Sequence, residues 1–206
     1  MANKRIFIMR HGNTFDKGDV MLRVGRGSDL PLSQSGRQQA SELGAHFKQL
    51  DISPELILVS PLQRTQQTAD GLLAAQPKLP AWQIDARLNE LDYGPDEGKP
   101  EDQVVARVGE AALSAWDERA EVPDGWPINP GALVMDWQLL LEDLRSETAE
   151  TIAIITSNGT ARFLLPLCEG QRPEAIKLKT AAYGELSLPQ DGRPQLISWN
   201  LWAPKL

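Results

Sequence analysis

Cysteine and histidine are both scarce in this sequence. The 206 residues include one cysteine, Cys168, and two histidines, His11 and His46. A single cysteine cannot form an intramolecular disulfide, which is typical of proteins in a reducing compartment. We expect Cys168 to be a small buried apolar residue near the end of a helix, with a catalytic thiol as the alternative.

Long apolar runs are missing as well. The N-terminal segment MANKRIFIMRHG lacks the apolar core and the small-residue cleavage site of a secretory signal. Later apolar runs stop well short of the roughly 20 residues that cross a bilayer, because charges or prolines interrupt each one. These absences predict a cytoplasmic protein with no membrane partner.

An excess of positive charge is also lacking, since the formal net charge is -7. A surface of this sign disfavours nonspecific binding to nucleic acid or to anionic membranes. A small anionic substrate is still compatible with it, because a few arginines in one pocket produce a local positive field. The overall charge therefore excludes one class of partner and leaves small phosphorylated molecules open.

The composition is that of an ordinary globular protein. Hydrophobic residues make up 41% of the chain and charged residues 24%. The length fits one domain over residues 1–206, and no internal repeat or low-complexity tract divides it. We expect this domain to carry a helical insertion at about 95–146.

The pattern of apolar residues predicts an α/β fold. We expect buried strands at 4–9, 55–60 and 151–156, and helices at about 33–50, 62–75, 101–119, 130–146 and after Gly159. Ser33 is a candidate N-cap of the first helix, and Asp191 with Gly192 predicts the turn of a C-terminal β-hairpin. The predicted fold is a three-layer sandwich, with a mostly parallel central sheet flanked by helices.

Polar residues follow three of the predicted strands at the point where each strand ends. Arg10 and His11 follow the first strand, Ser60 ends the second, and a turn at 157–159 follows the third. Ligands of open α/β sheets bind at the carboxyl ends of the strands. We therefore expect these residues, together with Arg64 four positions after Ser60, to converge on one site.

The residue types at these strand ends suit phosphoryl transfer without a metal. Such a site needs fixed positive charge for the phosphoryl oxygens, a nucleophile that can leave again and a proton donor for the departing alcohol. Arginine suits the first task, because its planar fork bonds two oxygens at once and stays charged. Arg10 and Arg64 are the candidates for it.

Four segments of the sequence resemble the histidine phosphatase superfamily, which includes cofactor-dependent phosphoglycerate mutases and many phosphatases. The segments are MRHGNT at 9–14, DLPLSQSGRQQA at 29–40, SPLQRTQQTA at 60–69 and RLNELDYG at 87–94. They occur in the family's order at about its usual spacing and cover the first half of the chain.

This resemblance implies a mechanism without metal or cofactor. His11 would attack phosphorus and form a phosphohistidine, Arg10 and Arg64 would hold the phosphoryl oxygens, and Glu90 would protonate the leaving oxygen and later activate water. Side-chain chemistry agrees, because imidazole is a competent nucleophile near neutral pH and a carboxyl group can shuttle a proton if its surroundings raise its pKa. Asp92 competes with Glu90 for the acid role, and the match of RLNELDYG to the family pattern favours Glu90.

The sequence departs from the family where a second histidine is expected. Asn158 stands there, and its amide can donate a hydrogen bond but brings no charge. Losing a charge-assisted donor is expected to cost about 1–3 kcal/mol of transition-state stabilisation. His46 falls in a predicted helix away from the strand ends, so we expect a helix-surface residue. Arg162, one helical turn beyond Asn158, could supply the charge, although an exposed helix-face arginine is the simpler interpretation.

Further residues are expected to contact the substrate. The predicted substrate-binding residues are Asn13, Thr14, Arg26, Asn158 and Gly159. Arg26 and the neighbouring Arg23 would meet the non-reacting part of an anionic substrate, with solvated loop charges as the alternative. The tryptophans at 116, 126 and 137 are expected to pack the core of the insertion rather than to roof the pocket.

The leading hypothesis is a metal-independent phosphatase that hydrolyses a small phosphate monoester. The alternatives are a noncatalytic phosphate-binding or regulatory protein, which the asparagine at 158 would explain, a phosphomutase, and a phosphatase of phosphorylated protein side chains. The sequence indicates neither the substrate nor an oligomeric state. Specificity is expected to depend on the loop at 15–30 and on residues 95–130 of the insertion.

Overall fold

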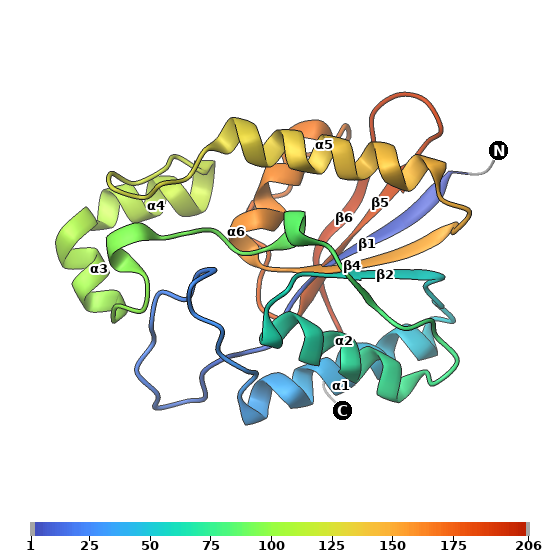
Figure 1. Cartoon of the computed structure of the whole chain (residues 1–206), viewed down its shortest axis with the longest axis horizontal. Helices are drawn as coiled ribbons and strands as arrows, with labels where there is room; N and C mark the ends of the chain where they lie inside the picture. Colours follow the sequence, from blue (N-terminus) through green and yellow to red (C-terminus); the bar gives the residue numbers. More distant parts are fainter. Residues whose placement is uncertain (1–2, 205–206) are drawn as a thin grey trace.

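Six strands form one mixed sheet in the computed structural model, which describes residues 3–204 (Figure 1). The strands are β1 (Lys4–Arg10), β2 (Leu56–Val59), β3 (Gln83–Ile84), β4 (Thr151–Thr156), β5 (Ala182–Leu188) and β6 (Gln195–Trp202). Their order is β3-β2-β4-β1-β5-β6. The first four are parallel to one another, and β5 and β6 form the antiparallel C-terminal hairpin.

Side chains of the central strands alternate between two apolar cores, as the period of two along a strand requires. Ile6 and Ile8 of β1 face one core, and Phe7 and Met9 face the other, and all four are fully buried. Strands buried on both faces explain the continuous apolar run IFIM, which an alternating pattern would not produce.

Helices cover both faces of the sheet, so the predicted three-layer sandwich is confirmed (Figure 1). One face carries α1 (Gln34–Gln49) and α2 (Gln63–Ala75), and the other carries α5 (Pro130–Ser146), α6 (Asn158–Ala161) and the 3-10 segment η3 (Arg162–Leu167). The Ser33 hydroxyl accepts from the Gly36 N–H at 3.2 Å, which confirms the predicted N-cap of α1.

The insertion differs in detail from the predicted arrangement. The helix expected at 101–119 is divided into α3 (Glu101–Val108) and α4 (Glu110–Arg119), because Gly109 between them takes a φ of 86° that glycine adopts readily. These two helices stand out beside the sandwich in Figure 1, whereas α5 lies on the sheet. The three tryptophans at 116, 126 and 137 are buried, as expected of core packing.

The segment after β4 also differs. The sequence predicts a turn at 157–159 followed by a helix, but α6 begins at Asn158 itself and ends after four residues. The chain then continues as the 3-10 segment η3, which contains Pro166. A proline lacks the N–H that a longer α-helix needs, so the region is a short, tight helical turn.

Candidate active site

The carboxyl ends of β1, β4 and β2 lie side by side at one edge of the sheet. Arg10 pairs with Thr156 in the parallel register of β1 and β4. The backbone N–H of His11 donates to Thr156 O at 3.2 Å, and that of Ser60 donates to Ile155 O at 3.1 Å. Because β4 lies between the other two strands, the expected convergence of three strand ends is confirmed.

His11 is buried at this edge and presents one ring nitrogen as a base. Its Nδ1 lies 2.7 Å from the carbonyl oxygen of Gly12. A carbonyl only accepts, so Nδ1 carries the proton and Nε2 keeps its lone pair. Burial, and then the charges of Arg64 and Arg10, hold the pKa of His11 well below its ordinary value. The imidazole is therefore neutral near pH 7 and has a free lone pair.

A close backbone contact positions the segment after His11. A side chain on Gly12 would overlap the carbonyl oxygen of Gly36, at the start of α1. The Gly12 N–H also donates to the Thr68 hydroxyl of α2 at 3.2 Å. Thr68 lies in the segment SPLQRTQQTA, but its residue type and position alone do not predict this contact. The glycine is needed here so that the loop can approach α1.

Arg10 and Arg64 are both held by backbone carbonyls. Arg10 Nη1 donates to Leu178 O at 3.0 Å, and Arg64 donates to Ser28 O at 2.7 Å and to Gly25 O at 3.1 Å. The Nε atoms of both arginines are buried and have no hydrogen-bond partner. Burial lowers the pKa of both side chains, yet guanidinium stays charged in proteins. The site thus contains two fixed cations with unused donors.

Carboxylates hold the loop at 12–33, which supplies the carbonyls for Arg64. Glu97 accepts from the Gly25 N–H at 2.8 Å and from the Ser28 hydroxyl at 2.6 Å. Asp16 accepts from two backbone N–H groups in the first turn of α1. Neither carboxylate was singled out from the sequence, because only the folded loop brings them to these donors.

Glu90 supplies a buried carboxyl group beside the two arginines. It accepts from the Leu91 N–H at 2.9 Å and from the Gly159 N–H at 3.4 Å. Burial raises its pKa, while the charges of Arg64 and Arg10 and these two hydrogen bonds oppose the rise. A carboxyl group of raised pKa can keep its proton near neutral pH and donate it.

Gly159 contributes to the site by leaving room for Glu90. A side chain at Gly159 would overlap a carboxylate oxygen of Glu90 and would press against Leu91. Its N–H donates to Glu90. The structure therefore shows Gly159, predicted to bind substrate, in contact with the acidic residue.

Asp92 lies in a different environment from Glu90. Its side chain is 41% exposed and accepts from the Gly94 N–H at 2.8 Å. Its nearest cation is Arg26, at 4.0 Å, and the Arg26 side chain is 61% exposed. These two residues form a solvent-exposed pair at the margin of the site, so the geometry favours Glu90 as the acid.

Asn158 begins α6 at the end of β4 and is buried. Its Oδ1 and the hydroxyl of the preceding Ser157 are both buried without a hydrogen-bond partner. Unpaired buried polar atoms are uncommon in folded proteins and cluster at functional sites. Here they lie next to Gly159, which contacts Glu90.

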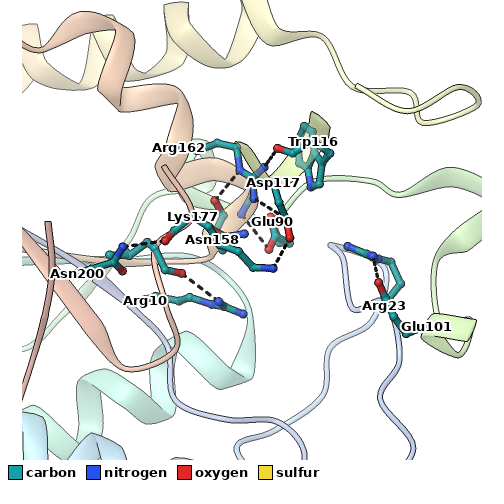
Figure 2. Close-up of polar contacts among 12 residues, drawn as sticks. Arg10, Arg23, Glu90, Glu101, Trp116, Asp117, Asn158, Arg162, Lys177 and Asn200 are labelled. Carbon is teal, nitrogen blue, oxygen red and sulfur yellow. Dashed lines mark hydrogen bonds and ion pairs between the residues drawn. The ribbon is translucent and has the colours of Figure 1, made fainter. Parts of the chain in front are cut away.

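Arg162 is not the exposed helix-face residue that the sequence suggests. It is 2% exposed, its guanidinium lies 4.1 Å from the ring centroid of Trp116, and it donates to Asn158 O at 3.4 Å (Figure 2). Asp117 faces it at 3.8 Å. Its charge lies close enough to Glu90 for the two to influence one another. The expectation fails because Trp116, 46 residues earlier in the chain, folds over this helix face.

Asn13 and Thr14 continue the loop after Gly12. The Asn13 side chain donates to the Ser35 hydroxyl at 3.1 Å, and its backbone N–H donates to Gln39 Oε1 at 2.8 Å. Both partners, Ser35 and Gln39, belong to α1. Thr14 is half-buried.

Arg23 is packed against aromatic rings rather than solvated. Its guanidinium lies 5.4 Å from the Tyr93 ring centroid and 5.3 Å from that of Trp126, and it is paired with Glu101. Tyr93 was not singled out from the sequence. Burial, and then the charge of Glu90, raise the pKa of its phenol, so it remains protonated.

His46 and Cys168 make packing contacts away from the phosphoryl site. His46 is half-buried rather than exposed, because its Nε2 lies 3.1 Å from the Tyr183 hydroxyl on the face covered by α1. Cys168 is half-buried after η3 and donates to Leu164 O at 3.5 Å. Burial raises the pKa of its thiol to about 12, so the reactive thiolate is not formed near neutral pH.

Residues 3–204 contain neither a metal-binding cluster nor a membrane-spanning helix. Side chains of histidine, cysteine, aspartate and glutamate do not gather there in groups of three that could hold a metal ion. Among the helices of the same residues, none is long and apolar enough to cross a membrane.

Comparisons with known proteins point to one family. A family model described as histidine phosphatase superfamily (branch 1) matches residues 6–201. The 2,3-bisphosphoglycerate-dependent phosphoglycerate mutase of Bartonella bacilliformis is 27% identical over 188 residues, which are 88% of this chain and 89% of the mutase. Fructose-2,6-bisphosphatase TIGAR B of Danio rerio is 36% identical over 119 residues, which are 57% of this chain and 45% of that protein.

Solved structures show the same fold. Mycobacterial glucosyl-3-phosphoglycerate phosphatase matches with a TM-score of 0.76 at 23% identity, covering 97% of this chain and 100% of that chain. The alpha-ribazole phosphatase from Shigella flexneri matches with a TM-score of 0.71 at 23% identity, covering 98% of each chain. The sheet and its two helical layers are therefore shared with known phosphatases.

Proposed function

The chain belongs to the histidine phosphatase superfamily, and from this membership we propose that it hydrolyses small phosphate monoesters through a phosphohistidine on His11. The observation that carries the proposal is the free Nε2 of a neutral, buried His11 beside two fixed guanidinium groups. The family resemblance seen in the sequence is confirmed by a match that extends past the four segments to nearly the whole chain.

The first step transfers the phosphoryl group to the protein. Nε2 of His11 forms a bond to phosphorus while the bond from phosphorus to the alcohol oxygen breaks. Arg10 and Arg64 stabilise the charge on the phosphoryl oxygens, for which their unpaired Nε groups are available. Glu90 gives its proton to the leaving oxygen, so the alcohol departs neutral.

The second step returns the enzyme to its starting state. The Glu90 carboxylate takes a proton from water as the water oxygen bonds to phosphorus. The bond from phosphorus to His11 breaks, and inorganic phosphate leaves. Both steps use the same four side chains, and no metal or nucleotide is needed in either.

The proposal is tested with a panel of sugar, glycerate and nucleotide phosphates in the presence of a chelator. We expect release of inorganic phosphate and a phosphoenzyme that can be trapped by rapid quenching. Transfer of the phosphoryl group to a second glycerate without release would indicate the mutase activity that the Bartonella relative suggests. Absence of both phosphate and phosphoenzyme would contradict the proposal and favour a noncatalytic phosphate-binding protein.

Arg162 is expected to supply the positive charge that Asn158 lacks. We expect Arg162→Gln to lower kcat/KM by roughly tenfold to a hundredfold, the cost of one charge-assisted interaction in a shielded site. Asn158→His should raise turnover of the native enzyme and should restore much of the loss in the Arg162→Gln background. Turnover of both single variants and of the double variant measures this coupling.

The pH profile separates this electrostatic role from a structural one. Removing a cation near Glu90 raises the pKa of its carboxyl group, so the alkaline limb of the profile should move to higher pH in Arg162→Gln. Arg145→Gln is the matched control. Arg162 donates to the carbonyls of Asn158 and Trp116, and Arg145 on α5 likewise donates to two carbonyls, at 3.2 and 2.6 Å, but these belong to the turn between β5 and β6. Equal losses in the two variants, without rescue by Asn158→His, would contradict the prediction.

A further inference from the structure

A cavity of about 350 Å³ lies between the loop at 12–33 and the insertion. Its charged lining residues are Arg23, Glu101, Asp117 and Lys177, and Trp116 and Leu113 contribute apolar walls. No motif or pattern in the sequence points to a role for Glu101, Asp117 or Lys177. The mechanism described above also leaves this cavity unused.

Three of the segments that line the cavity also contact residues of the phosphoryl site. Lys177 precedes Leu178, whose carbonyl accepts from Arg10. Trp116 lies against Arg162, which donates to the carbonyl of Asn158. The loop that carries Arg23 also supplies the two carbonyls that hold Arg64. The segments of Arg23, Trp116 and Lys177 therefore connect the cavity to residues of the phosphoryl site.

The charges of this cavity are already neutralised in pairs. Lys177 Nζ lies 2.6 Å from Asp117 Oδ2 on α4, and Arg23 is paired with Glu101 on α3. Figure 2 shows the two pairs on opposite sides of the space that the guanidinium of Arg10 points toward. Both carboxylates come from the insertion, and both cations come from the segments that flank the strand ends.

These pairs make the cavity unfavourable for a second anion. A carboxylate or phosphate entering it meets two carboxylates, and it can bind either cation only by displacing the existing partner. That exchange breaks an existing ion pair and leaves its carboxylate facing the new anion, which cancels the gain. A hydroxyl group or an aromatic ring meets no such cost, because it can donate to the carboxylates or pack on Trp116.

We propose that this cavity binds the leaving alcohol and selects phosphate monoesters whose alcohol is uncharged. The inference rests on the proposed phosphatase activity and adds its substrate class. Such a preference distinguishes this chain from enzymes whose substrates carry a second phosphate or a carboxylate beside the reacting group. The two ion pairs that involve residues of the insertion would be responsible for it.

The test uses two substrates that differ at one group. Glycerol 3-phosphate and 3-phosphoglycerate share the phosphate ester and the central hydroxyl, and they differ in a hydroxymethyl group against a carboxylate. We expect kcat/KM to be at least about tenfold higher for glycerol 3-phosphate. Equal values, or a preference for 3-phosphoglycerate, would overturn the inference while leaving the phosphatase activity intact.

Variants of the carboxylates test the cause of the preference. Glu101→Gln frees Arg23 and Asp117→Asn frees Lys177, so each should shift the ratio of kcat/KM values toward 3-phosphoglycerate by about fivefold. Asp117 also lies 3.8 Å from Arg162, so for Asp117→Asn the ratio of the two substrates is compared and not the absolute kcat/KM. Glu110→Gln is the matched control, because it removes the same charge from an exposed position in the first turn of α4. A shift of the same size in all three variants would assign the preference to overall charge and would contradict the role of the ion pairs.

A binding measurement distinguishes failure of this inference from failure of the proposed function. Calorimetry on the His11→Ala protein gives Kd values for both compounds without turnover, because Arg10 and Arg64 remain to hold the phosphate. We expect the same tenfold preference for glycerol 3-phosphate. If the protein shows no phosphatase activity but keeps this preference, the proposed function fails and the cavity's selectivity stands; equal Kd values would overturn the selectivity.

Discussion

Replacing His11 by alanine is expected to lower kcat/KM by at least about 1,000-fold on every substrate that the protein hydrolyses. Neither the arginines nor Glu90 can substitute for it, because none offers an unprotonated nitrogen to phosphorus. The trapped phosphoenzyme should disappear as well. Steady-state kinetics and rapid-quench labelling with a phosphorylated substrate measure the two effects.

His46 provides the matched control for this substitution. It is the second of the two histidines, and its Nε2 contacts the Tyr183 hydroxyl on the α1 face. We expect His46→Ala to lower Tm through lost packing and to retain most of the activity and all of the phosphoenzyme. Labelled His11→Ala protein, or loss of the label in folded His46→Ala, would contradict the assignment of the nucleophile.

Replacing Glu90 by glutamine should give the second largest loss, about 100-fold or more in kcat/KM for alkyl phosphates. An alkoxide is a poor leaving group, so the first step depends on the proton that Glu90 donates. Nitrophenolate leaves without a proton. With p-nitrophenyl phosphate, we therefore expect the variant to release close to one equivalent of nitrophenolate per enzyme in a burst. Hydrolysis of the phosphoenzyme should then be slow, because Glu90 is also needed to activate water.

The pH dependence follows from the same two residues. Burial raises the pKa of Glu90, so its proton is retained above the ordinary carboxyl range and kcat/KM falls as pH rises through that raised pKa. The pKa of His11 is lowered, so the fall on the acid side lies below the ordinary imidazole range. Glu90→Gln should remove the alkaline limb and leave the acid limb.

Asp92→Asn is the control for this prediction. Asp92 was the competing candidate for the acid role, and its carboxylate accepts from the Gly94 N–H at the margin of the site. We expect the variant to keep most of the activity on alkyl phosphates and the alkaline limb of the native enzyme. If Asp92→Asn loses the limb while Glu90→Gln keeps it, the two roles must be exchanged.

The buried arginines show how far the local pattern of residues reaches. Arg10 and Arg64 were placed at the site because each lies within four residues of a strand end, and strand ends are legible from short apolar runs. Arg162 lies equally near the end of β4, yet its position on a helix predicted an exposed side chain. Its burial depends on Trp116, which belongs to the insertion and has no relation to it in sequence.

The sequence by itself determined the layers of the fold, the cap of α1 and the family, because these depend on residues that are neighbours along the chain or lie in ordered segments. Only the tertiary structure decided which charges are paired. The pair of Arg23 and Glu101 joins residues 78 positions apart, and the pair of Lys177 and Asp117 joins residues 60 positions apart. No periodicity or motif in the sequence relates the members of either pair. The physical reason is that the pKa of a buried group and the partner of a surface charge depend on neighbours in space. Residues 9–14 predicted the nucleophile, and the folded chain decided the charge around it.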